Sequence, residues 1–454
     1  MVRYGARSGP WVPDWRRENL RTNLWLVPTI LTLAAGALFV VTDVIDHAAH
    51  RGSITLPAWV TLGGADAGRE VLIGAAALVI TVAGVVFSVT IVVLTLASQQ
   101  FGPRMLRNFI RDLGTQVSLG AYVATFVYSV LALGSIGGGG PRPFVPHVSI
   151  AVCLALLLVD VVVLIYFIHH IATMIQLPHV IAGIAGDLRE AIVVQSSQAP
   201  AQAGSDLNSS EFVDLSRKLR DEGRMVSASA SGYLQVVRHE LLVDIASAND
   251  CSIELLYRPG HFVTEGLPLA RVWPERAAPQ VSAALARSHV AGPHRTLSQD
   301  SVFAIDQLVE IAIRALSAAV NDTFTALTCI DWLTDGLCHI TRAPSPEGVH
   351  RDASGAIRLI ELPASYSRTV DRAIDKVRQA GRGMPAILIR QMDGMAKVLS
   401  ECKTSEQHSV IMRQVEMISR AGADIPEPND LRALEHRYQR IVRDFGTFRA
   451  PKVT

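Results

Sequence analysis

The sequence lacks an excess of charge of either sign. Its 42 lysine and arginine residues nearly balance its 41 aspartate and glutamate residues, and the formal net charge is +1. A protein that binds nucleic acid through the phosphate backbone needs a concentrated basic surface, and basic residues gather here only beside apolar segments. We therefore expect no DNA or RNA partner.

Catalytic signatures and paired cysteines are also missing. The sequence contains no Gly-x-x-x-x-Gly-Lys phosphate loop, no His-Glu-x-x-His pair, no nucleophile elbow and no Rossmann glycine pattern. None of the 5 cysteines belongs to a Cys-x-x-Cys pair, which favours reduced structural thiols in a protein that faces the cytosol. We predict that the chain is not an enzyme and that it carries no cofactor.

Charge is absent from one long apolar stretch, residues 71–97. Because a helix rises about 1.5 Å per residue, this stretch is long enough to cross a bilayer. Three further apolar segments are of similar length. The four predicted spans, within a membrane domain of residues 24–180, are residues 24–44, 71–97, 117–136 and 148–168.

The distribution of arginine predicts the orientation of these spans. Arginines cluster in the N-terminal segment 1–23, between the second and third spans, and after the fourth, whereas the other two loops contain only Arg51, Arg69 and Arg142. Cytoplasmic loops are enriched in arginine. We therefore expect a multi-pass inner (plasma) membrane protein with both termini in the cytoplasm.

Small and hydroxyl side chains recur at helical spacing along the second span. Such a face either lets neighbouring helices pack closely in lipid or lines a water-filled path. The pathway candidates are Thr81, Ser88 and Thr95, together with Asp160 near the middle of the fourth span. A carboxylate in the bilayer must be neutral, paired or hydrated, so Asp160 is either a functional group or a protonated partner of a nearby serine or threonine.

Two polar segments flank the spans. Residues 103–113 predict an interfacial helix whose Arg104, Arg107 and Arg111 would contact anionic lipid headgroups, with a merely solvated basic face as the alternative. At the end of the first span, acids and histidines at i, i+3, i+4 and i+7 could bind a divalent metal or form a solvated helix end. These four residues are Asp43, Asp46, His47 and His50.

A second region follows a Ser/Gln/Ala/Gly-rich linker at residues 195–210. Strand-like segments alternate with turn signals over residues 211–300 and predict a small β domain. Its Pro-Gly-x-Phe-Val turn resembles that of biotinyl and lipoyl barrel-sandwich domains. No lysine occurs between Lys218 and Lys376 to carry such a cofactor, so at most the scaffold is shared.

Residues 301–445 are expected to be mostly helical, with a tail at residues 446–454. A helix predicted at residues 302–320 is apolar except for polar residues along one line, which form either a structural ion pair and subunit contact or a ligand site. This polar line comprises Asp306, Glu310, Arg314, Ser317 and Asn321. Asp322 is expected to cap the next helix.

Two segments carry a family resemblance. Residues 87–112, which include Phe-Gly-Pro-Arg-Met-Leu, and residues 311–326, which include Leu-Ser-Ala-Ala-Val-Asn-Asp, resemble signature blocks of the bacterial predicted-membrane-protein family called domain of unknown function 2254. Residues 167–176 are similar to a third block. Ala318 and Thr323 stand where the family usually has proline. The resemblance implies a membrane architecture and supplies no activity.

Together these patterns predict an α-helical membrane protein with four transmembrane helices and a cytoplasmic α+β region, a small barrel-sandwich-like β section followed by helices. The leading hypothesis is a homo-oligomeric ion channel or transporter with a cytoplasmic assembly or gating domain. The alternative is a non-transporting membrane-anchored scaffold or sensor whose cytoplasmic domain binds a partner. Either way, the expected partners are anionic lipids and further copies of the chain, and the sequence identifies no ligand.

Overall fold

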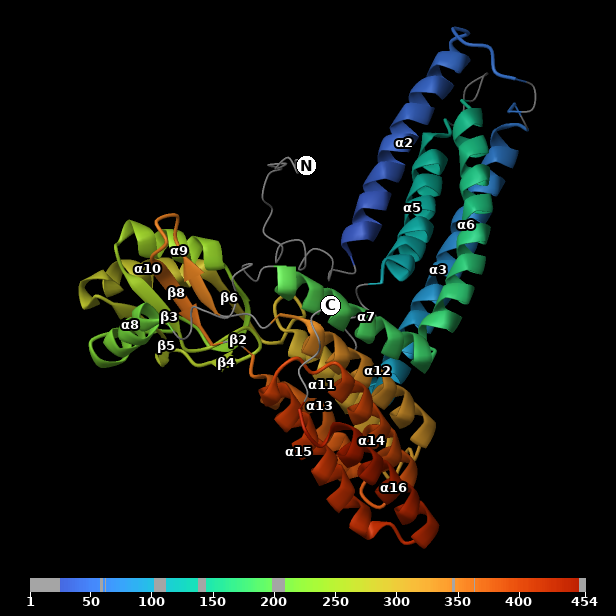
Figure 1. Ribbon diagram of the computed structural model, residues 1–454. Coiled ribbons are helices and arrows are strands. Elements are labelled where there is room, and N and C mark those ends of the chain that lie inside the picture. The colour runs from blue at the N-terminus through green and yellow to red at the C-terminus, as the bar shows by residue number, and fades with distance from the viewer. Residues whose placement is uncertain are drawn as a thin grey trace, which may run out of the picture. The chain divides into compact units, whose positions relative to one another are not determined.

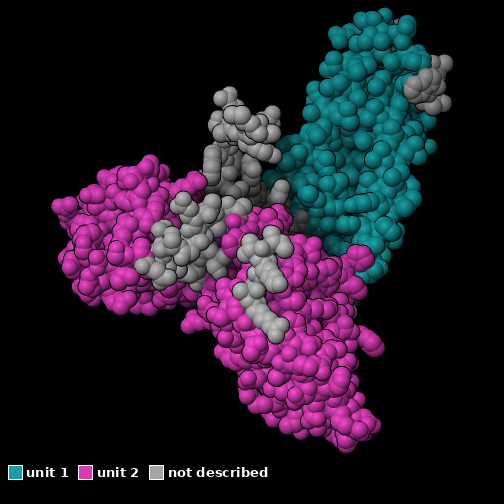
Figure 2. All heavy atoms as spheres, viewed as in Figure 1, with its two compact units in different colours: residues 1–176 teal, residues 177–454 magenta. Residues whose placement is uncertain are grey.

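The chain forms two compact units, residues 1–176 and 177–454 (Figure 2). The computed structural model describes residues 25–57, 60–61, 63–101, 112–137, 144–197, 209–344, 348–362 and 364–448. The basic N-terminal segment and the arginines of the predicted interfacial helix, Arg104, Arg107 and Arg111, lie outside these described residues. The last residue predicted for that helix, Leu113, is instead the first residue of a membrane-type helix.

The first unit consists of long helices (Figure 1). They are α2 (Leu26–His50), α3 (Ala65–Phe101), α5 (Leu113–Ser135) and α6 (His147–Met174). Each contains a segment long and apolar enough to span a membrane. The four predicted spans are confirmed at this level, although the helices begin and end up to several residues away from the predicted limits.

Helix α5 has the most extensive contacts in this unit, and it packs against α2, α3 and α6. It supplies two large, fully buried side chains, Tyr122 and Tyr128. Gly120 allows α2 to approach closely, since a Cβ atom there would lie 2.7 Å from Cδ1 of Leu31. Close approach through a small residue is the usual way in which membrane helices gain packing contacts.

The second unit contains two sheets and a set of helices (Figure 1). The strands are β1 (Arg224–Ser227), β2 (Gly232–Val237), β3 (Ser252–Leu255), β4 (Phe262–Val263), β5 (Pro268–Trp273), β6 (His289–Gly292), β7 (Val349–Arg351) and β8 (Ile357–Glu361). The helices among them are α8 (Ser210–Asp221), α9 (His239–Ala248) and α10 (Ala278–Ser288).

The sheet topology does not confirm a barrel-sandwich. One sheet has five strands in the order β1-β5-β3-β8-β7, and the other has three in the order β4-β2-β6. β3 pairs with β8 in parallel, whereas the other pairs are antiparallel. Strands from the section predicted to be helical thus complete the larger sheet. The predicted boundary at residue 300 does not separate a β domain from a helical one.

The remaining helices pack on one another in the same unit. They are α7 (Leu177–Ser197), α11 (Ser301–Ala315), α12 (Thr323–Arg342), α13 (Tyr366–Ala380), α14 (Pro385–Ser400), α15 (Ser405–Ala421) and α16 (Pro428–Phe445). Two predicted boundaries are corrected here. α7 continues to Ser197, three residues into the predicted linker, and α11 ends at Ala315 rather than near residue 320.

Candidate functional site

Asp46 connects two helices of the first unit. Its side chain is buried, with 2% of the residue exposed. Its Oδ1 accepts the backbone N–H of Val148 at 2.7 Å, and its Oδ2 accepts the N–H and the hydroxyl of Ser149 at 3.0 and 2.8 Å. α6 has no side-chain cap from its own flanking residue, Pro146. Asp46 of α2 therefore caps the first turn of α6.

The other three residues of the predicted metal segment lie apart from this contact. Nδ1 of His47 is 3.4 Å from Oδ2 of Asp43 and 2.9 Å from the backbone oxygen of Asp43. The rings of His47 and His50 contact Phe144. Among the residues described, Asp46 is directed toward α6, and the four side chains do not form a group of converging ligands.

The hydroxyl residues predicted to line a pathway lie on the outer face of α3. Thr81, Ser88 and Thr95 are exposed, and the hydroxyls of Thr81 and Thr95 donate to backbone oxygens one turn earlier, at 2.7 and 2.9 Å. Gly74 and Gly84 are also exposed, and a Cβ atom at either would meet nothing within 4 Å. This face is not covered by the other three helices of the unit.

Asp160 occupies a different position, inside the helix bundle. Only 6% of the residue is exposed, and the Thr125 side chain is its hydrogen-bond partner. The hydroxyl of Tyr122 donates to the backbone oxygen of Asp160 at 3.2 Å. Oδ2 of Asp160 has no hydrogen-bond partner in the part of the chain that is described. The structure therefore separates Asp160 from the exposed hydroxyl face.

The predicted polar line of the second unit is not continuous. Asp306 lies on α11, but Ser317 and Asn321 follow the end of this helix, and Asn321 has a positive φ of 50°. The predicted cap is confirmed, because Asp322 accepts the N–H of Thr325 at 3.1 Å and its hydroxyl at 2.6 Å. These hydrogen bonds lower the pKa of Asp322. Glu310 and Arg314 remain half-buried on α11.

A second group of charges surrounds Asp306. Four arginines from two loops and one helix approach two aspartates at the start and the second turn of α11. We call this group the arginine cluster, and its members are Arg258, Arg295, Arg368, Arg372, Asp300 and Asp306. Of these residues, sequence analysis singled out only Asp306.

Two of the arginines form ion pairs within the cluster. Nε of Arg295 donates to Oδ2 of Asp300 at 2.8 Å, and its NH1 donates to Asp306. Arg372 donates to the other carboxylate oxygen of Asp306. Asp300 is 4% exposed, and Gly260 packs directly against it. Arg295 and Arg372 thus compensate the buried carboxylate of Asp300 and the partly buried carboxylate of Asp306.

The other two arginines add positive charge without a carboxylate of their own. Neither Arg258 nor Arg368 donates a side-chain hydrogen bond to another residue described in the structure. Burial lowers the pKa of Arg258, Asp300 opposes this effect, and the neighbouring arginines reinforce it. Burial also lowers the pKa of His261, as do Arg258 and the other three arginines. Within the described residues, the cluster therefore holds two guanidinium groups that make no hydrogen bond to a carboxylate, and their positive charge disfavours protonation of the His261 imidazole.

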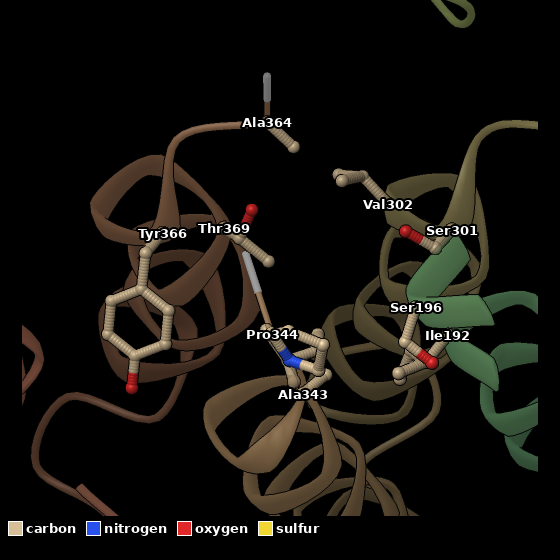
Figure 3. Close-up of a pocket in the computed structure, with 10 residues that line it drawn as sticks. Ile192, Ser196, Ser301, Val302, Ala343, Pro344, Ala364, Tyr366 and Thr369 are labelled. Carbon is tan, nitrogen blue, oxygen red and sulfur yellow. The ribbon is translucent and has the colours of Figure 1, made fainter. Parts of the chain in front are cut away.

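A largely apolar pocket adjoins the same helix starts (Figure 3). Ser301 and Val302 at the start of α11 lie on one side with residues of α7, and Tyr366 and Thr369 of α13 lie on the other, with Pro344 between them. Ser301 follows Asp300, and Thr369 follows Arg368. The pocket and the arginine cluster therefore share the first turns of α11 and α13.

Comparisons with known proteins agree with the membrane architecture. The family model described as predicted membrane protein (DUF2254) matches residues 21–397. The chain is 29% identical over 462 residues to uncharacterized proteins of Mycobacterium bovis and Mycobacterium tuberculosis, and the match covers 96% of this chain and 84% of each relative. No solved structure matches the chain. The chain belongs to the predicted membrane protein family DUF2254.

Proposed function

We propose that the protein is a membrane-anchored receptor whose second unit binds a phosphate monoester at the arginine cluster. The observation that carries this proposal is the charge of the cluster, in which four arginines face only two aspartates. The excess of two positive charges matches a phosphate monoester, which carries a charge of about −1.5 to −2 at pH 7. The first unit would serve as the membrane anchor.

The pocket beside the arginine cluster indicates what the part of the ligand attached to the phosphate is like. Arg258 and Arg368 provide guanidinium groups that form no salt bridge with any described residue, and these suit a phosphate because their N–H groups match its oxygens. The neighbouring pocket is lined mainly by apolar side chains, among them Val302 and Pro344. The proposed ligand is therefore an organic phosphate with an apolar body, rather than inorganic phosphate alone.

The proposal predicts that phenyl phosphate stabilises the protein. A ligand that binds only the folded state at 100 times its Kd adds about 2.7 kcal/mol to the free energy of unfolding. Thermal unfolding of the full-length protein in lipid nanodiscs should therefore shift upward with phenyl phosphate. Phenyl sulfate, which has the same shape and one negative charge, should give a much smaller shift at matched ionic strength. Equal shifts would contradict a site for a dianion.

A second candidate function rests on the exposed face of α3. We propose that this face joins copies of the chain into a homo-oligomer, which would place Thr81, Ser88 and Thr95 along a shared axis and permit ion transport.

Gly84→Leu should then reduce oligomer mass and ion flux in liposomes while the subunit remains folded. Gly36→Leu on α2 is the matched control, because Gly36 also has open space around it. Unchanged mass and flux in Gly84→Leu would eliminate this candidate.

Both candidates place the second unit in the cytoplasm, with both termini on that side of the inner membrane. The support is the clustering of arginine before the first span and between the second and third. Reporter domains fused after residues 111 and 200 should both show cytoplasmic activity. A periplasmic signal from either fusion would reverse this topology.

A further inference from the structure

Three metal-type ligands meet in the second unit, at residues that the arginine cluster does not include. His239 is the first residue of α9, His350 lies in β7, and Glu361 is the last residue of β8. One ligand atom from each lies within 4.8 Å of the other two. We propose that His239, His350 and Glu361 bind a divalent transition-metal ion of the Zn²⁺ class.

Two of the three distances between the ligand atoms fit such an ion. Nε2 of His239 is 2.9 Å from Oε2 of Glu361, and Nε2 of His350 is 3.1 Å from Oε1 of the same carboxylate. Ligands about 2.0–2.1 Å from a metal are separated by about 2.8–3.0 Å in octahedral geometry and about 3.3–3.4 Å in tetrahedral geometry. The two observed separations therefore allow an ion to be accommodated with small movements of the side chains.

The backbone holds the three residues in place. Glu361 donates its N–H to the oxygen of Gly348 at 2.7 Å, and β8 pairs with β3 on its other side. A Cβ atom at Gly348 would lie 2.2 Å from the backbone oxygen of Glu361. The close approach of the two backbones therefore requires glycine at this position. The rings of His239 and His350 are stacked with their centroids 4.8 Å apart. A site fixed by two strands and a helix start needs little reorganisation to bind an ion.

The chemistry of the set also suits a transition metal. Two imidazoles and one carboxylate are the protein ligands of known zinc and iron sites, and they leave further coordination positions open. A glutamate carboxylate is ionised at neutral pH, as metal ligation requires. Without an ion, hydrogen bonds among the same three residues connect α9 to the sheet.

Metal titration distinguishes a metal site from a purely structural hydrogen-bonded contact among these three residues. The full-length protein, purified without a histidine tag and stripped with a chelator, should bind one Zn²⁺ per chain in competition with a chromophoric chelator. His350→Ala and Glu361→Gln should each weaken this binding by at least about 100-fold, because loss of even an outer-shell partner costs about 10- to 100-fold. His436→Ala, at an exposed histidine of α16, should leave the affinity unchanged.

Comparing the wild type with His350→Ala also excludes Zn²⁺ bound elsewhere. This variant retains the acids and histidines of the segment from Asp43 to His50, so binding there would be equal in both proteins. Zn²⁺ should in addition raise the thermal unfolding midpoint of the wild type, and this measurement decides the question if either variant fails to fold. The proposal is overturned if the wild type binds Zn²⁺ no more tightly than folded His350→Ala, or if Zn²⁺ does not stabilise the wild type.

Discussion

Gly260→Ala should destabilise the second unit by several kcal/mol, whereas Gly266→Ala should cost only about 1–2 kcal/mol. Both glycines have a positive φ, 92° and 79°, so both substitutions incur the strain of a left-handed backbone, about 1–2 kcal/mol. Only at Gly260 would the new Cβ also lie 2.1 Å from Oδ2 of Asp300. Asp300 is buried and held by Arg295, so it cannot move aside without breaking that ion pair.

The two alanine variants form a matched pair, because nothing lies within 4 Å of a Cβ at Gly266. Thermal unfolding of the full chain gives the total effect, and hydrogen exchange of peptides covering α11 locates it. Gly260→Ala should accelerate exchange at the start of α11, next to Asp300. Similar losses of stability in both variants would show that Asp300 is not fixed against the turn.

Asp46→Ala should have a comparably large effect on the first unit. It removes the acceptor for the buried N–H and hydroxyl of Ser149 and for the partly buried N–H of Val148, at the start of α6. A buried donor left without a partner costs about 1–3 kcal/mol. We therefore expect a loss of several kcal/mol, part of which Asp46→Asn should recover because its amide oxygen can still accept one hydrogen bond.

Asp43→Ala is the control for this substitution, because it makes the same chemical change one turn earlier on α2. In the part of the chain that is described, the charged partner of the Asp43 side chain is His47 of its own helix. The thermal unfolding midpoint in detergent should fall strongly for Asp46→Ala and little for Asp43→Ala. An equal, small decrease in both would mean that α6 does not depend on Asp46.

The features predicted correctly are those encoded locally. The membrane spans follow from the length of uninterrupted apolar sequence. Asp322 lies directly before its helix, which is the position from which a carboxylate can cap the helix. Asp46 shows the limit of such reasoning. Its spacing with Asp43 and His50 suggested a shared face of one helix, but its partners lie about 100 residues later, on a different helix.

Long-range pairing explains what was missed in the second unit. The parallel contact of β3 with β8 joins strands about 100 residues apart, and no local pattern in either strand specifies it. The arginine cluster is assembled in the same way, from a turn at Arg258, a loop at Arg295 and a helix at Arg368. The Pro-Gly-x-Phe-Val turn that follows Arg258 was visible in the sequence, but its approach to α11 required the fold.

Calorimetric titration of phenyl phosphate is the most direct test of the arginine cluster as a ligand site. A hydrogen bond to a charged group contributes about 1.5–3 kcal/mol, so Arg258→Gln should weaken binding by about tenfold or more. Arg287→Gln, which removes the same charge from an exposed position on α10, should bind as tightly as the wild type. This pattern supports a phosphate site at the cluster. Equal affinities of the wild type and Arg258→Gln, or no heat of binding to the folded wild type, would contradict it.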